Sequence, residues 1–238
     1  MAGRAIGTEM VLKDGLRPYA ETSPGHFPVE PVNTVTCLAF VVVGLYWARK
    51  TRMRISLHPL VVMSVPVLFV GAFGGMLHHA FRDFRDLRHL DMLMAFYGVA
   101  MACVFFWRGV TKSWVMSFSM TLVVPLVFRL FLSDTGGRIA SASVVYVAMA
   151  LALLPPVGIR CFMDGSRRVF YPLLASVFFA VGVFFRESDS LPSLEGGIGT
   201  HCLWHVFGAL SVFAILGYAY ALELEGEGFN VRKNDGGN

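Results

Sequence analysis

The chain has 238 residues, of which 55% are hydrophobic and only 15% are charged. Soluble globular domains carry about 25% charged residues, so this composition argues against an ordinary soluble fold and indicates a membrane protein. The net charge of +4 lies mostly in short basic connections, and we find no nucleic-acid-binding motif, so nucleic acid is not expected as a partner.

The chain begins with a polar arm, residues 1–30, whose first residues are mixed in charge and do not resemble a cleavable signal peptide. Long apolar runs follow, each close to the length of about 20 residues that crosses a bilayer as a helix. We therefore predict an all-α polytopic protein, a seven-transmembrane-helix bundle over residues 31–222, with a polar tail at 223–238. The predicted helices are 31–48, 58–80, 90–108, 114–132, 140–162, 169–185 and 201–222.

The first, third and fifth connections between these runs are basic, which predicts that they face the cytoplasm. The N-terminus is then outside and the C-terminus cytoplasmic. The second connection is also basic, with Arg82, Arg85 and Arg88, but Asp83 and Asp86 lie among them. This pattern predicts a multi-pass integral membrane protein, either in a bacterial inner membrane or in a eukaryotic endomembrane or plasma membrane.

Histidines gather at the predicted outer ends of the helices. His201 and His205 are four residues apart and share one helix face. The predicted arrangement of the spans brings His79 and Asp91 to the same membrane depth as these two histidines. Three imidazoles and a water form a tetrahedral zinc site, and an aspartate beside the water can accept its proton. The alternative interpretation is a polar cluster that lines a water-filled vestibule.

Three blocks of sequence resemble the alkaline ceramidases and their bacterial ceramidase-like relatives, in the CREST superfamily of seven-helix membrane hydrolases. The first is Glu30–Thr34 (Glu-Pro-Val-Asn-Thr), at the start of the first helix. The second is Leu77–Arg82 (Leu-His-His-Ala-Phe-Arg) followed by Leu90–Met92. The third and most specific is Gly199–His205 (Gly-Thr-His-Cys-Leu-Trp-His).

The resemblance implies that His79, His201 and His205 bind zinc and that Asp91 bonds the zinc-bound water. The family usually has a serine at the position of Gly75, so this chain lacks that hydroxyl, and the glycine is also consistent with close helix packing. Family members hold calcium in the arm before the first helix. The corresponding positions here are Glu21, Glu30 and Asn33.

At the preceding acidic position of that calcium site the chain has Arg17, which makes calcium doubtful. For Glu30 the alternative is a carboxylate at a helix N-terminus. The remaining charged residues are interpreted as solvated. They include Arg186, Glu187 and Asp189, which could instead support the site, and the tail acids Glu223, Glu225 and Glu227.

Together these observations predict an intramembrane zinc-dependent amide hydrolase that acts on a ceramide-like or other N-acylated lipid. The alternative is a non-catalytic seven-helix receptor or lipid-binding protein with a structural zinc, and the missing serine at Gly75 favours it. A transporter is less consistent with the sequence, because the ionisable residues within the membrane gather at one depth. The sequence indicates neither the exact lipid nor the oligomeric state.

Overall fold

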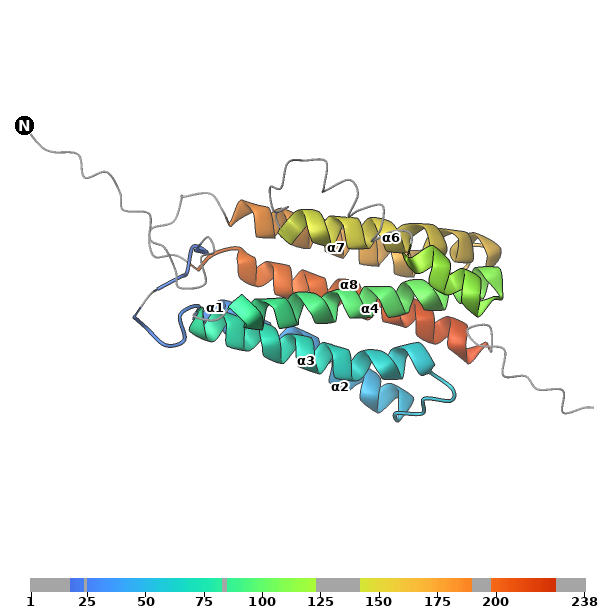
Figure 1. The fold of residues 1–238 in the computed structure, drawn as a ribbon, viewed down its shortest axis with the longest axis horizontal. Helices are drawn as coiled ribbons and strands as arrows, with labels where there is room; N and C mark the ends of the chain where they lie inside the picture. Colours follow the sequence, from blue (N-terminus) through green and yellow to red (C-terminus); the bar gives the residue numbers. More distant parts are fainter. Residues whose placement is uncertain (1–17, 24, 83–84, 123–141, 190–197, 226–238) are drawn as a thin grey trace, which may run out of the picture.

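A computed structural model describes residues 18–23, 25–82, 85–122, 142–189 and 198–225, and within these ranges the chain is helical without strands. Figure 1 shows the helices lying alongside one another in a bundle. Residues 114–122 are also helical. The bounds of the labelled helices are α1 Pro31–Thr36, α2 Leu38–Thr51, α3 Pro59–Phe81, α4 Arg85–Thr111, α6 Ala142–Met163, α7 Phe170–Ser188 and α8 His201–Leu224.

Six helical stretches of the described chain are long and apolar enough to cross a membrane. The first combines α1 and α2, and the others are α3, most of α4 and of α6, α7 and α8. The prediction of a multi-pass helical membrane protein is therefore confirmed. Of the additional helix predicted at 114–132, the structure describes only the part up to residue 122, so the count of seven and the orientation of the termini stay predictions.

A buried apolar core joins the helices along their length. Phe106 of α4 stacks on Tyr218 of α8, with ring centroids 5.5 Å apart, and Trp47 of α2 packs against Tyr220 of α8. The most extensive helix pairs are α7 with α8 and α3 with α4. Burial of these large side chains holds α8 in contact with helices from both ends of the chain, which fixes where its first turn lies.

The N-terminal arm lies at one end of the bundle, where α3 ends and α4 and α8 begin (Figure 1). Its backbone is hydrogen-bonded to the last turn of α3, because Val29 N donates to Ala80 O at 2.9 Å and Glu30 N donates to His79 O at 3.1 Å. The ends of α3, α4 and α8 that were predicted to share one membrane depth lie together here, and the assignment of this end to the outer side stays a prediction. We call this the arm end of the bundle.

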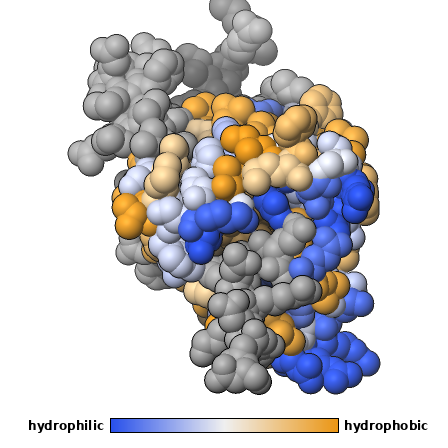
Figure 2. Space-filling view, turned by 90° about the vertical axis from the view of Figure 1, so that its right-hand side faces the viewer, coloured by the Kyte–Doolittle hydropathy of each residue, from blue (hydrophilic) through white to orange (hydrophobic). Residues whose placement is uncertain are grey.

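The opposite end differs from expectation at Glu223, which was assigned to an exposed tail. The α8 helix continues to Leu224, and Glu223 is buried, with its Oε1 accepting a hydrogen bond from Leu60 N at 3.0 Å. The first N–H groups of a helix have no partner within the helix, so a carboxylate satisfies them and is favoured by the helix dipole. Figure 2, a view onto this end, shows hydrophilic patches between apolar ones, as expected for an end that leaves the hydrocarbon region.

Candidate metal centre

Three buried imidazoles meet at the arm end. The ring centroid of His79, from the last turn of α3, lies 5.3 Å from that of His201 and 5.0 Å from that of His205. His201 and His205, on the first two turns of α8, have centroids 4.9 Å apart. The structure therefore brings together the three histidines that the sequence singled out, although they come from helices far apart in the chain.

His79 is held by a carboxylate on the arm. Its Nδ1 lies 2.5 Å from Oε2 of Glu30, a fully buried residue whose other oxygen pairs with the guanidinium of Arg82. A carboxylate accepts and does not donate, so Nδ1 carries the proton and the lone pair of Nε2 is left for another partner. This is the carboxylate–histidine arrangement that orients histidines bound to metals.

A hydroxyl fixes His205 in the same way. Thr36 Oγ1 lies 2.9 Å from Nδ1 of His205 and also 2.9 Å from the carbonyl oxygen of Val32. A helical threonine hydroxyl commonly donates its one proton to the carbonyl four residues before it, and in that arrangement Thr36 accepts the proton of Nδ1. Both imidazoles are thus held in the tautomer that leaves Nε2 free to bind a cation.

His201 is held by its backbone and by the face of its ring. Its N–H donates to Oδ1 of Asp189 at 3.0 Å, and its ring stacks on Tyr19 of the arm with centroids 3.8 Å apart. Asp189 is buried and also bonds the arm at Ala20 N, so its interpretation as a solvated residue is wrong. Within the described residues, Nδ1 of His201 is buried without a hydrogen-bond partner.

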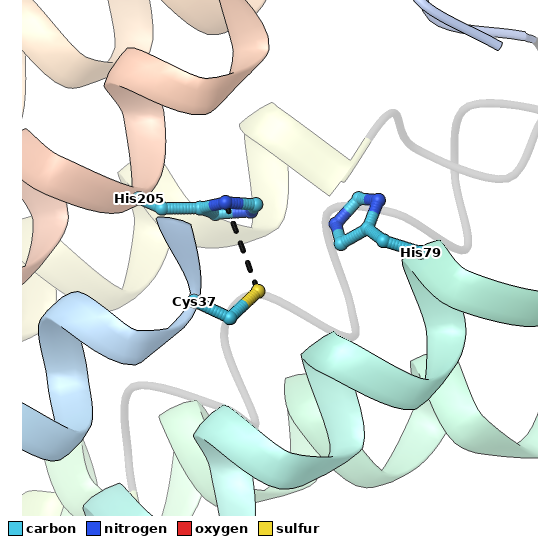
Figure 3. A group of neighbouring side chains, drawn as sticks. All are labelled: Cys37, His79 and His205. Atoms are coloured by element: carbon cyan, nitrogen blue, oxygen red, sulfur yellow. Dashed lines mark hydrogen bonds between the residues drawn. The ribbon is translucent and has the colours of Figure 1, made fainter. Parts of the chain in front are cut away.

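Cys37 completes the cluster, and sequence reasoning had not included it. Its thiol lies where the first membrane-spanning stretch is interrupted between α1 and α2. Cys37, His79 and His205 each offer one donor atom, and these atoms lie within 4.8 Å of one another (Figure 3). This buried group could hold a metal ion. In the sequence Cys37 is one of four cysteines in or beside apolar runs, and no spacing singles it out.

Asp91 lies beside the same cluster, across Gly75 of α3. A Cβ atom at Gly75 would be 3.1 Å from Sγ of Cys37 and 3.7 Å from Oδ1 of Asp91. Asp91 therefore lies near the thiol, in the second turn of α4 rather than at its start, and its role beside a metal-bound water stays a prediction.

Arg186 also differs from the solvated interpretation. Its guanidinium lies 5.4 Å from the ring centroids of both Tyr146 and Trp204, and its Nε donates to Ser143 Oγ at 3.1 Å. The faces of these two aromatic rings hold the guanidinium in a fixed place within the bundle. It supplies a positive charge at the arm end.

The residues assigned to a doubtful calcium site have other partners. The two oxygens of Glu21 accept hydrogen bonds from Val32 N at 3.1 Å and Asn33 N at 2.6 Å, so Glu21 caps α1. Burial raises the pKa of Glu21 above its ordinary value, and these two N–H groups partly oppose the shift. Glu30 accepts from Thr22 and faces Arg82, a fixed positive charge. These contacts tie the arm to the bundle and do not favour calcium.

The donors present fit a bound transition metal. Histidine nitrogens and a cysteine sulfur are the ligands of zinc and similar ions, and a buried ring nitrogen without a partner, as in His201, is explained by an ion that it can bind. Comparisons with protein-family models and with curated proteins give no match. The likeness to ceramidases therefore remains one of short motifs, and the chemistry has to be argued from the cluster itself.

Proposed function

We propose that the protein is an intramembrane zinc-dependent amide hydrolase that acts on a ceramide-like or other N-acylated lipid. The observation that carries the proposal is the meeting of three buried imidazoles with ring centroids 4.9–5.3 Å apart, next to a carboxylate, at one end of a membrane bundle. Ionisable groups at membrane depth are costly and are retained for function.

Zinc is the metal that this donor set favours. His79, His201 and His205 offer neutral nitrogens, and imidazole ligands suit zinc far better than magnesium or calcium, which prefer oxygen. The Glu30 contact to His79 and the Thr36 contact to His205 support the assignment, because such outer partners orient ligands and raise their basicity.

When bound, zinc supplies Lewis-acid chemistry, polarising the amide carbonyl and lowering the pKa of a water towards neutrality. The protein's own groups do the rest. Asp91 takes a proton from the attacking water and passes it to the leaving nitrogen. Arg186, held against Tyr146 and Trp204 at the same end of the bundle, offers a positive charge to a polar head group.

The position of the cluster supports a lipid substrate. The six spans supply an apolar surface that places the bundle in a bilayer, and the cluster is at the end of three of them. An amide that joins a fatty acyl chain to a polar head group lies at this depth in a membrane. The resemblance of the three motifs to ceramidases points to the same class.

The test combines metal analysis with hydrolysis of a panel of N-acyl lipids by the purified protein in lipid nanodiscs. We expect zinc, released fatty acid, and loss of both on chelation with recovery on adding zinc. Asp91→Asn should retain zinc and lose hydrolysis, because an amide does not accept the proton. Asp164→Asn, which changes a carboxylate paired with Arg168 at the opposite end, is the matched control and should remain active. Full activity in Asp91→Asn would exclude Asp91 as the base.

A second candidate is a non-catalytic receptor or lipid-binding protein with a structural zinc. The observation that favours it is that Cys37 lies among the possible ligands beside His79 and His205, because cysteine is a common ligand of structural zinc sites. This candidate predicts bound zinc and thermal stabilisation by zinc, with no hydrolysis of any lipid in the panel.

A further inference from the structure

We propose that Cys37 binds the metal through its sulfur, so that the site has a mixed thiolate and imidazole donor set rather than histidines alone. The inference rests on the metal of the proposed function but not on hydrolysis. It assigns a ligand that neither the histidine spacing nor the resemblance provides.

The first support is the position of the thiol among other donors. Sγ of Cys37 packs against the ring of His205, 3.7 Å from its Nδ1, and one possible ligand atom from each of Cys37, His79 and His205 lies within 4.8 Å of the others (Figure 3). Three side chains from α3, α8 and the α1–α2 turn thus converge on one point. In a zinc site, sulfur and nitrogen ligands lie ~2.3 Å and ~2.0–2.1 Å from the ion, so only small movements are needed to bind one.

The second support is the way in which the fold holds the thiol there. The N–H of Cys37 still bonds to Asn33 O, at 3.3 Å, but the helix is interrupted at this residue before α2 begins. On the other side, Gly75 of α3 offers no side chain, and a Cβ there would be only 3.1 Å from Sγ. The thiol therefore fills the space that a side chain on α3 would otherwise take, facing the imidazoles.

A buried cysteine is often a small apolar residue, and two others in this chain behave in that way. Cys161 belongs to the apolar core, and Cys103, also buried, lies on the same stretch of α4 as Phe105 and Phe106. Cys37 differs because its neighbours are donor groups. An independent observation at the same end of the bundle points to an ion, since Nδ1 of His201, whose ring centroid lies 4.9 Å from that of His205, is buried without a partner among the described residues.

A bound zinc ion would itself favour the thiolate form of Cys37. A zinc ion bound by neutral imidazoles alone brings two positive charges into a buried site, which is costly in a medium of low dielectric constant. A thiolate cancels one of them. Glu30 does not serve this purpose, because its charge is already paired with Arg82. A sulfur ligand also selects zinc over the oxygen-preferring ions.

The test uses the full-length protein loaded with cobalt(II) in place of zinc. A thiolate bound to cobalt gives an intense sulfur-to-metal charge-transfer band in the near ultraviolet, which histidines do not give. We expect this band in the wild type and its loss in Cys37→Ser, with cobalt still bound through the histidines. Cys202→Ser is the matched control, because Cys202 is also buried, on the first turn of α8, but is not among the possible ligand atoms that lie within 4.8 Å of one another, and it should keep the band.

X-ray absorption of the zinc-loaded wild type gives the same answer without any variant. We expect a sulfur shell at ~2.3 Å together with nitrogens at ~2.0–2.1 Å. Bound metal with neither the band nor the sulfur shell overturns the role of Cys37 and leaves the hydrolase proposal standing. A protein that binds neither metal overturns both proposals. A sulfur ligand without hydrolysis supports Cys37 and contradicts the hydrolase.

Discussion

Glu30 and His79, forty-nine positions apart in the sequence, are joined by a contact of 2.5 Å between Oε2 and Nδ1. The same carboxylate pairs with Arg82, which lies three residues after His79 and is also buried. One acidic residue therefore fixes the tautomer of a candidate ligand and neutralises a buried cation. Through these two contacts Glu30 links the arm to the candidate metal centre.

Replacing Glu30 by glutamine should weaken both functions. The loss of the carboxylate partner of His79 should lower metal affinity about 10- to 100-fold, since outer partners have effects of this size. The loss of the negative charge beside buried Arg82 should cost about 3–5 kcal/mol in unfolding free energy. Competition with a coloured zinc chelator measures the first, and denaturation in mixed micelles measures the second.

The control for Glu30→Gln is Glu21→Gln, on the same arm. Glu21 accepts hydrogen bonds from Val32 and Asn33 at the start of α1, so its loss should affect the arm but not the tautomer of His79. We expect metal affinity close to that of the wild type. An equal fall in affinity for both variants would show that the arm acts only by its general stability.

Tyr19 should slow the exit of the metal. Its ring stacks on His201 at 3.8 Å, and Arg82 lies 5.3 Å from the ring centroid on the arm side. Aromatic contacts of this kind are worth about 0.5–1.5 kcal/mol, so Tyr19→Ala should speed zinc removal by a chelator about 2- to 10-fold. Tyr19→Phe keeps the stacking ring and should lose zinc at the wild-type rate. Equal rates in all three proteins would contradict a covering role for the arm.

The helices could be predicted because runs of about 20 apolar residues carry the signal locally. The pairing of His201 with His205 is local too, since both lie on two turns of one helix. The meeting of His79 with these two histidines follows from the predicted number of spans, because the chain reverses direction from one span to the next. Each of these inferences needs only the period of a helix and the alternation of direction across a membrane.

Contacts that depend on side-chain packing could not be predicted. Cys37 lies in an apolar run, where a cysteine is indistinguishable from any small core residue, and only the folded bundle brings it to His205. The Glu30–His79 contact joins an arm to a distant helix with no spacing to mark it. Glu223 was assigned to the tail because a charge normally ends an apolar run, whereas here it caps α3.

Glu223 should stabilise the end of the bundle opposite the metal centre. Its Oε1 accepts from Leu60 N, and Oε2 lies 3.3 Å from Nδ1 of His58. Glu223→Ala leaves the N–H of Leu60 buried without its acceptor, at a cost of about 1–3 kcal/mol in unfolding free energy. Glu223→Gln retains an acceptor oxygen and should lose less. Glu225→Ala, where the side chain is 48% exposed, should have little effect. A similar loss at both alanine variants would contradict the capping role.

Gly75 and Cys37 should depend on each other. A methyl group at Gly75 would be only 3.1 Å from Sγ of Cys37, closer than side chains normally pack, so Gly75→Ala should destabilise the metal-free protein by about 1–3 kcal/mol. Cys37→Ala removes the sulfur and leaves a small cavity, which has its own cost. In the double variant the new methyl group occupies the space that the sulfur has left.

The unfolding free energies of the two single variants and of the double variant should therefore not add. We expect the double variant to be more stable than the sum of the single effects predicts, by about 0.5–3 kcal/mol, as for residues in direct contact. Gly158→Ala in α6 is the control, because no other side chain lies within 4 Å of its Cβ position, and it should be neutral or slightly stabilising with either residue at 37. Gly75→Ser follows the same reasoning. Its hydroxyl should raise amide hydrolysis only after Cys37→Ala has made room for it. If the unfolding free energies of the Gly75 and Cys37 variants simply add, the glycine is not retained to make space for the thiol.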